Sequence, residues 1–461
     1  MALLGAVIVP HPPVILSTVG RGREREIQPT IDAYRAAARK VAEWAPDTLV
    51  VSSPHVVMYS DYFHIPPGGS TIGDMARFGA PQTKLETAYD IDLRREIIAQ
   101  AEAAGIRAGT MGERDAKLDH GTFIPLYFLQ EAGVNVPIVR IGLSGFSPLT
   151  HYRLGECVAR SVEKLNRRAV YIASGDLSHK LQADGPYGYV PEGPIFDKEI
   201  VETLKSADFL RFLTLDPSMC ERAAECGLRS FQMMAGALDG LAVQADFLNH
   251  EDKFGVGYGI ATFTVTGRDE SRRYAERYES AERERLAKKK ASEDAWVQLA
   301  RKSLETYVRT KKPLSALPDG LPVELTQAKA GAFVSLHIRD SLRGCIGTTA
   351  PTTDSVAWEI VQNAISAGTR DPRFPPVRAD ELDKLEYSVD VLGTPEPTTA
   401  AELDVKRYGV IVSCGGRRGL LLPDLDGVDS VEEQISIARQ KGGIGARERY
   451  ALERFEVVRH T

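Results

Sequence analysis

Short, continuous apolar runs and longer amphipathic stretches alternate along the first part of the chain. Runs rich in Val and Ile are typical of strands that are covered on both faces. They occur at residues 4–10, 47–53, 136–142, 169–174 and 257–267. Between them, residues 31–44 and 90–105 carry apolar side chains at helical spacing. This alternation predicts an α/β domain with a mixed sheet and helices on both faces.

A different pattern begins near residue 292. A helical stretch at 293–310 precedes two pairs of strand-like runs, at 331–347 and 408–423, and each pair is joined by turn residues. A further helical stretch lies at 355–368, and further strand-like runs lie at 387–393 and 455–460. This pattern predicts a smaller α+β domain.

The segment between the two patterns is highly charged. In residues 268–290, 15 side chains are charged, and opposite charges lie four residues apart, as in Glu279 with Arg283. This pattern favours an exposed helix. Its positive and negative side chains cancel each other, so the helix offers no consistent positive potential to the phosphate groups of a nucleic acid. We therefore expect domains at 1–267 and 292–461, joined by a charged helical linker at 268–291.

Composition narrows the class of protein. A chain of 461 residues exceeds what one core usually supports, which agrees with two domains. The net charge of -6 argues against nucleic acid as a partner, and no apolar run reaches membrane-spanning length. The five cysteines are odd in number and scattered, which suits a reducing compartment. We expect a cytoplasmic protein.

Histidines mark the ends of the predicted strands. His11 ends the first strand, His55 follows the second and His179 comes just after the run at 169–174, while His120 lies among turn residues. Ligands of open α/β sheets gather outside the carboxyl ends of the strands. The histidines are therefore expected to converge on one crevice, although a single histidine at such a place is usually an ordinary loop residue.

Two imidazoles and a carboxylate make a facial site that suits Fe(II) and leaves positions open for substrate. His11 and His55 are the candidate imidazole ligands. The third ligand is either Glu225 or Cys226, which lie at the start of a predicted helix. The charge of Glu225 would also be favourable there simply because of the helix dipole. A thiolate at Cys226 would bind iron or zinc.

Three further residues are candidates for proton transfer. His120 and His179 are candidate acid/base groups, because an imidazole titrates near neutral pH. Asp176 would orient or charge the ring of His179, or is simply a turn-forming residue.

These residues lie in motifs that resemble a known family. The segments "VPHPP", "SSPH", "DHG" and "SGDLSH" resemble the class III extradiol ring-cleavage dioxygenases and the related Memo proteins over residues 1–267. The resemblance implies Fe(II) held by His11 and His55, with His120 and His179 as the acid/base pair. The family's glutamate ligand falls at Gly227, whereas Memo proteins carry a cysteine followed by glycine, as at Cys226 and Gly227 here.

The second domain resembles another family. The segments "LRGCIG", "DPRFPPV" and "LEYSVDVL" resemble the AMMECR family over residues 293–461. Cys345, in the first of them, is either a reactive thiol or a buried small residue. Arg343 and Arg373 would bind a carboxylate or phosphate, or form surface ion pairs.

Memo-like and AMMECR-like proteins occur with a radical-SAM protein in the AmmeMemoRadiSam system, which makes such a protein an expected partner. The sequence predicts a non-haem Fe(II)-dependent oxidoreductase of the extradiol type, acting on a catechol-like or other chelating small molecule. Zinc or another divalent metal is an alternative to iron. The sequence also allows a homo-oligomer. The alternatives are another metal-dependent step within that system, or a scaffold that binds a ligand without turnover.

Overall fold

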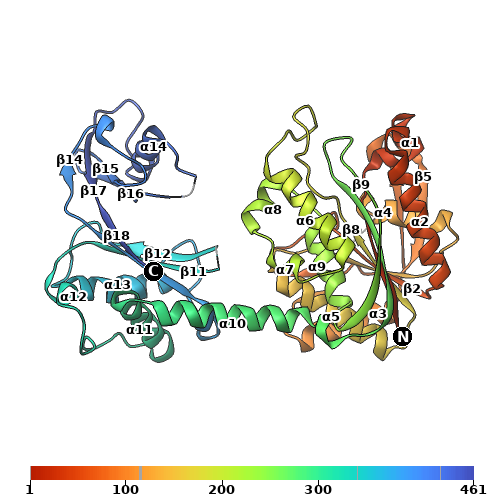
Figure 1. Ribbon diagram of the computed structural model, residues 1–461, viewed down its shortest axis with the longest axis horizontal. Coiled ribbons are helices and arrows are strands. Elements are labelled where there is room, and N and C mark those ends of the chain that lie inside the picture. Colours follow the sequence, from red (N-terminus) through yellow and green to blue (C-terminus); the bar gives the residue numbers. More distant parts are fainter. Residues whose placement is uncertain (1, 114–116, 340, 426) are drawn as a thin grey trace. The chain divides into compact units, whose positions relative to one another are not determined.

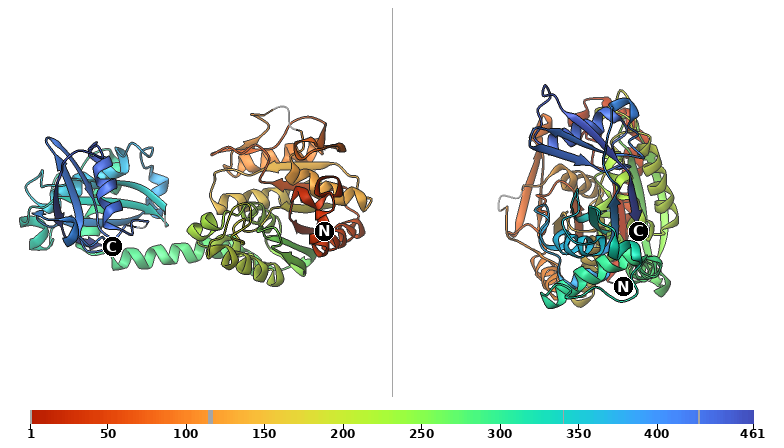
Figure 2. Two further views of the ribbon diagram at one scale, coloured as in Figure 1. Left: turned by 90° about the horizontal axis from the view of Figure 1, so that it is seen from above. Right: turned by 90° about the vertical axis from the view of Figure 1, so that its left-hand side faces the viewer.

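The computed structural model describes residues 2–113, 117–339, 341–425 and 427–461. The chain divides into two compact units, Met1–Ser280 and Ala281–Thr461. The division lies within α10 (Tyr274–Ser292), a continuous helix formed by most of the charged segment (Figure 2). In the described part of the chain, no helix combines the length and the hydropathy that crossing a bilayer requires.

The first unit is built around one six-stranded mixed sheet (Figure 1). From edge to edge, its strands are β7 (Ile138–Gly142), β2 (Thr48–Ser53), β8 (Ala169–Ser174), β1 (Leu3–Val9), β10 (Tyr258–Arg268) and β9 (Leu241–Glu251). The first four are parallel, and β10 pairs antiparallel with both β1 and β9. The predicted mixed sheet is confirmed. Strand β9 was not predicted, because polar residues interrupt its apolar ones and all its side chains are partly or fully exposed.

Helices cover both faces of this sheet. Alternate residues of β8 point to opposite sides, so that Tyr171 packs in one apolar cluster and Ile172 in the other. The first cluster includes side chains of α3 (Ile91–Ala103), α5 (Pro148–Lys164), α6 (Glu192–Ser206) and α9 (Leu228–Ala237). The second includes side chains of α2 (Gln28–Trp44) and α4 (His120–Glu131). Burial on both faces explains why the central strands are continuous apolar runs.

Smaller elements surround the sheet of the first unit. Two two-stranded sheets pair β3 with β6 and β4 with β5. The remaining elements are α1 (Ser17–Gly20), β3 (Phe63–His64), β4 (Ser70–Met75), β5 (Ala80–Ala88), β6 (Ala108–Gly109), α7 (Arg211–Thr214) and α8 (Pro217–Ala223).

The second unit contains two four-stranded antiparallel sheets with helices. One sheet has the order β12 (Ser341–Gly347), β11 (Ala332–Ile338), β13 (Glu386–Leu392), β18 (Val457–His460), and the other β14 (Glu396–Pro397), β17 (Ala451–Phe455), β15 (Gly409–Cys414), β16 (Arg417–Leu421). The helices are α11 (Ala295–Thr310), α12 (Val323–Gln327), α13 (Val356–Thr369) and α14 (Val431–Lys441). The expected α+β character is confirmed, and both predicted hairpins form, as β11–β12 and β15–β16.

Candidate metal centre

Two histidines meet at the carboxyl edge of the six-stranded sheet. His11 follows the last residue of β1 by two positions, and His55 follows the last residue of β2 by two positions. Because β1 and β2 both flank β8 in the parallel direction, their ends lie at the same edge. The Nε2 atoms of the two histidines are 3.0 Å apart. His11 is buried and His55 is exposed, so one ring is enclosed by protein and the other is reachable from solvent.

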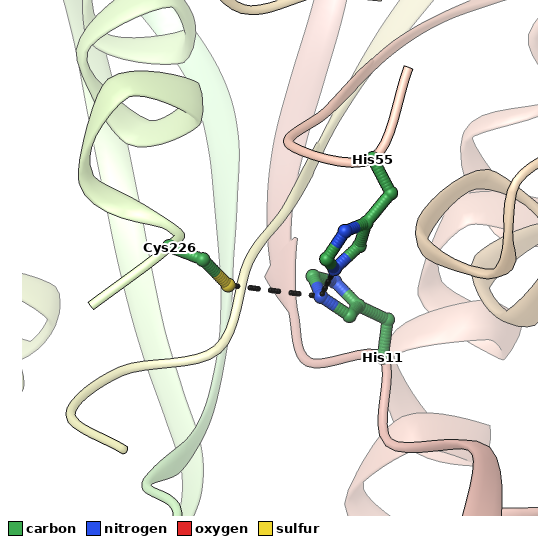
Figure 3. A group of neighbouring side chains, drawn as sticks. All are labelled: His11, His55 and Cys226. Carbon is green, nitrogen blue, oxygen red and sulfur yellow. Dashed lines mark hydrogen bonds between the residues drawn. The ribbon is translucent and has the colours of Figure 1, made fainter. Parts of the chain in front are cut away.

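Cys226 brings a third ligand atom to this pair, as Figure 3 shows. Its Sγ lies 3.7 Å from His11 Nε2, and the three ligand atoms are all within 4.8 Å of one another. Nitrogen and sulfur atoms that bind one metal ion at about 2.0–2.3 Å lie roughly 3.0–3.6 Å from each other. The two shorter separations in this group are therefore close to those of ligands that share an ion.

Hydrogen bonding sets the tautomer of His11. The Ser174 hydroxyl donates its proton to the Gly121 carbonyl oxygen at 2.5 Å, so its oxygen faces His11 Nδ1 as an acceptor at 2.9 Å. His11 Nδ1 therefore carries the ring proton, and Nε2 presents a lone pair to the centre. Burial lowers the pKa of both His11 and His55. Both rings are consequently neutral at pH 7, which is the form that binds metals.

Close backbone packing places the thiol. A Cβ atom on Gly175 would lie 2.1 Å from the Cα of Gly227, and a Cβ on Gly227 would lie 2.5 Å from the ring of Phe231. This contact brings the backbone N–H of Asp176 to Cys226 Sγ, to which it donates at 3.3 Å. A side chain at position 227 would therefore clash with its surroundings, and the preceding residue, Cys226, supplies the group beside the imidazoles.

The other candidate third ligand, Glu225, points to a different partner. Its carboxylate accepts the backbone N–H of Leu228 at 2.7 Å, at the start of α9. Burial raises the pKa of Glu225 to about 7. Among the described residues, neither group of candidate metal ligands includes Glu225. The carboxylate satisfies an unpaired donor of the helix terminus, which was the alternative that its position suggested.

Asp176 and His179 lie on the turn that follows β8. One Asp176 oxygen, Oδ1, accepts the backbone N–H of His11 at 2.8 Å. The other, Oδ2, lies 3.8 Å from His11 Nε2 and 4.0 Å from His179 Nε2. Burial raises the pKa of Asp176 to about 6 and lowers that of His179. The carboxylate thus stands between the two imidazoles.

His120 is the first residue of α4 and stacks on the candidate ligand His55. Their ring centroids are 4.0 Å apart with an interplanar angle of 28°, and the centroids of His120 and His11 are 5.4 Å apart. Burial, together with the nearby rings of His55 and His11, lowers the pKa of His120 to about 3. The ring is therefore neutral at pH 7 and is placed to accept a proton beside the centre.

Asp119 organises this part of the site, although it was not among the predicted site residues. Its Oδ1 accepts from the Ser53 hydroxyl at 2.6 Å and from the Thr122 backbone N–H at 2.9 Å, and its Oδ2 lies 3.5 Å from Arg140 Nη1. Burial opposes ionisation, but Arg140 and these hydrogen bonds hold its pKa below the usual value. The feature of the sequence that could have indicated this role is that Asp119 directly precedes the segment that forms α4, since Asp is a preferred N-cap residue. It ties the start of α4 to the end of β2.

The second unit contains a separate candidate residue, Cys345, on β12. Ser335 donates a hydrogen bond to its thiol at 3.2 Å, and burial raises the pKa of that thiol. Arg373 pairs with Asp371 at 2.7 Å and Arg343 pairs with Glu381 at 2.8 Å. Both arginines are thus engaged by carboxylates of the protein, which is the commoner of the two roles considered for them.

Comparisons with known proteins give a family match for each part of the chain. Residues 5–261 match the family described as the catalytic LigB subunit of aromatic ring-opening dioxygenase, and residues 297–460 match the AMMECR1 family. Protein CA_C1420 of Clostridium acetobutylicum is 40% identical over 468 residues, which cover 100% of this chain and 99% of that protein.

Two shorter matches were also found. A Thermotoga maritima protein is 56% identical over 155 residues, covering 33% of this chain and 88% of that protein. The crystal structure of the uncharacterized protein PH0010 from Pyrococcus horikoshii is 32% identical, covers 36% of this chain and 88% of that one, and gives a TM-score of 0.34.

The LigB match, over residues 5–261, includes all of β2, β7, β8 and β9, most of β1 and the first four residues of β10. It also includes every candidate residue of the metal centre. Dioxygenases of this family use metal ions, and the described residues of this chain include a group of candidate metal ligands. The chain belongs to the LigB family of aromatic ring-opening dioxygenases through its N-terminal domain, and it carries an AMMECR1 domain at its C-terminal end.

Proposed function

We propose that the N-terminal domain is a non-haem Fe(II)-dependent oxidoreductase of the class III extradiol type, acting on a catechol-like or other chelating small molecule. One observation carries the proposal. In a chain of the LigB family, the ligand atoms of His11, His55 and Cys226 lie within 4.8 Å of one another at the carboxyl edge of the sheet. Two imidazoles and one anionic ligand leave positions open for substrate on Fe(II).

The donor set also fits a metal ion chemically. The lone pair of His11 Nε2 faces the centre because Nδ1 is hydrogen-bonded to Ser174. Burial raises the pKa of the Cys226 thiol well above its usual value. A cation beside the sulfur reverses that effect, because a coordinating thiol is deprotonated. A thiolate in place of the usual glutamate also suits zinc, which remains the alternative metal.

When bound, iron would act as a Lewis acid that lowers the pKa of a coordinated hydroxyl group. The residues of this chain would then move protons around the substrate. His120 is neutral at pH 7 and would accept a proton from a substrate hydroxyl, and His179 would return a proton to an oxygen of the opened product. Asp176 Oδ2, 4.0 Å from His179 Nε2, would stabilise that ring in its charged form.

Oxygen uptake with a panel of catechols tests the proposal. Protein reconstituted anaerobically with Fe(II) is expected to consume O2 with at least one catechol, with the ring-opened product seen by its absorbance. A His120→Gln variant should retain iron and lose most of the turnover, about 10²–10⁴-fold for a general acid or base. Iron-loaded wild-type protein that consumes no O2 with any member would overturn the dioxygenase proposal.

A second candidate function is supported by two features of the chain. The AMMECR1 domain accompanies the LigB-type domain, and the third candidate ligand atom beside the two imidazoles is the sulfur of Cys226, not a carboxylate oxygen. These features favour a different metal-dependent step, carried out with a radical-SAM partner, or ligand binding without turnover. Two results together would favour the metal-dependent step with a radical-SAM partner. The protein would bind metal without O2 uptake, and a radical-SAM protein would co-purify with it from the native organism. We also propose a cytoplasmic location, because all five cysteines are free thiols, which persist in a reducing compartment.

A further inference from the structure

A second group of possible metal ligands lies beside the first and shares one atom with it. Among the described residues, Asp176, His179 and Cys226 also place one ligand atom each within 4.8 Å of one another. The sulfur of Cys226 belongs to both groups. We assign Oδ2 of the carboxylate to this second group, because Oδ2 lies 4.0 Å from His179 Nε2 while Oδ1 accepts the backbone N–H of His11.

The carboxylate of Asp176 points to a cation for a separate reason. It is buried, and buried carboxylates are commonly paired with a cation or bound to a metal. Elsewhere in this unit, the largely buried Asp119 lies 3.5 Å from the guanidinium of Arg140. Among the described residues, Asp176 has no lysine or arginine nitrogen within 4.0 Å, and its ion-pair partners are the rings of His11 and His179. A cation beside Oδ2 would therefore supply a positive charge that neither lysine nor arginine provides there.

The ligand chemistry of the second group suits a divalent transition metal. It combines one carboxylate, one imidazole and one thiolate, a mixed set that zinc, cobalt and iron accept. A thiolate sulfur has lone pairs for two cations, and metal ions of two-metal sites lie about 3.5–4 Å apart. The group is also reachable from solvent, since His179 is only partly buried and its ring faces that of the exposed Tyr187 at 5.2 Å.

We propose that Asp176, His179 and Cys226 form a second divalent-metal position, which shares the Cys226 thiolate with the ion held by His11 and His55. The second ion binds more weakly than the first, because the two cations repel each other and share one anionic ligand. We assign the stronger position to the two imidazoles of His11 and His55. An ion there occupies His179 Nε2 and removes this ring from proton transfer. The second ion is therefore an inhibitor of the reaction that the singly loaded centre performs. This last consequence rests on the proposed function, whereas the binding of a second ion does not.

Cobalt titration of the metal-free, full-length protein tests the second position. Under anaerobic conditions, the wild-type chain is expected to bind about two Co(II) ions, with both steps visible in the absorbance of thiolate bound to cobalt. Asp176→Asn and His179→Gln should each bind about one ion, with the first step retained. Asp184→Asn, which removes an exposed carboxylate from the nearby loop, is the matched control and should bind about two. Circular dichroism verifies the fold of each variant.

The outcomes separate this proposal from the proposed function. Saturation of the wild-type chain by a single ion overturns the second position and leaves the first intact. Binding of two Co(II) ions by both Asp176→Asn and His179→Gln would also overturn the second position. Two ions in the wild type and one in the variants support it, even if the protein consumes no O2 with any catechol. If the chain is active, stoichiometric Fe(II) should give the highest rate, and a tenfold excess should lower the rate of the wild type.

Discussion

The Nε2 atoms of His11 and His55 lie 3.0 Å apart, although 44 positions separate the two residues in the chain. The parallel pairing of β1 and β2 with β8 brings these positions together, and a two-residue connection after each strand holds each ring at the sheet edge. The close approach of Gly175 and Gly227 then brings Cys226 to the same place. Backbone packing, more than any single side chain, assembles the candidate centre.

Single substitutions of the two candidate third ligands, Cys226 and Glu225, distinguish their roles. Cys226→Ser should weaken metal binding strongly, because a hydroxyl is a far poorer ligand than a thiolate. Glu225→Gln should bind metal as the wild type does, because its amide oxygen can still accept the Leu228 N–H. The expected change in its unfolding free energy is below about 1 kcal/mol. Metal content after desalting measures the first effect, and urea unfolding the second. Loss of metal in Glu225→Gln with retention in Cys226→Ser would reverse the assignment.

Asp119 is predicted to support both stability and the placement of His120. Asp119→Ala removes the acceptor of Ser53 and Thr122 and leaves the buried Arg140 without this carboxylate. Breaking a buried ion pair in this way costs about 3–5 kcal/mol. Asp119→Asn keeps part of the hydrogen bonding and should lose less. Denaturant unfolding of the metal-free chains compares them, and equal stability of all three proteins would contradict the role given to Asp119.

The stability of the first unit should depend on pH through His151. Its ring is buried between the Ser144 N–H, which donates to Nε2, and the Ser147 carbonyl, which accepts from Nδ1. Burial lowers its pKa to about 3, against about 6.5 in an unfolded chain. The unfolded state therefore binds the proton first, and the stabilisation present above pH 6.5 is lost as the pH falls towards 3.

Between pH 7 and pH 5, this residue should remove about 2 kcal/mol of stability. His151→Gln lacks the titrating group and should show a smaller decrease over the same range, although its stability at pH 7 is lower. Calorimetry of the metal-free full-length chains at the two pH values gives the comparison. An unchanged pH dependence in His151→Gln would contradict a neutral buried ring at this position.

The thiol of Cys345 is expected to react slowly. Burial raises its pKa, so little thiolate is present at pH 8, and the thiolate is the nucleophile. Alkylation by iodoacetamide, followed by peptide mass spectrometry, should label Cys345 more slowly than a cysteine in a short unstructured peptide. Labelling as fast as that peptide would indicate an activated thiol and a chemical role for the AMMECR1 domain.

Much of the architecture follows from sequence pattern, because strands buried on both faces are continuous apolar runs. The same pattern predicted that His11, His55 and His179 would gather, since the ends of parallel strands share an edge. The choice between Glu225 and Cys226 was not predictable in this way. Neighbouring residues at a helix start point in different directions, and the direction here depends on the contact of Gly227 with Gly175, 52 positions away. The roles of Asp119 and Ser174 were missed for a similar reason, because each acts through a partner that is distant in sequence.

The metal content of anaerobically purified protein tests the central claim most directly. After reconstitution with one equivalent of Fe(II) and desalting, the wild-type chain should retain about one iron per chain, because three protein ligands converge on one position. His11→Ala and His55→Ala, folded as judged by circular dichroism, should retain much less iron than the wild type, because each loses one of the two imidazoles that hold the first ion. Wild-type protein without bound iron, or variants that retain as much as the wild type, would contradict a metal centre built on these two histidines.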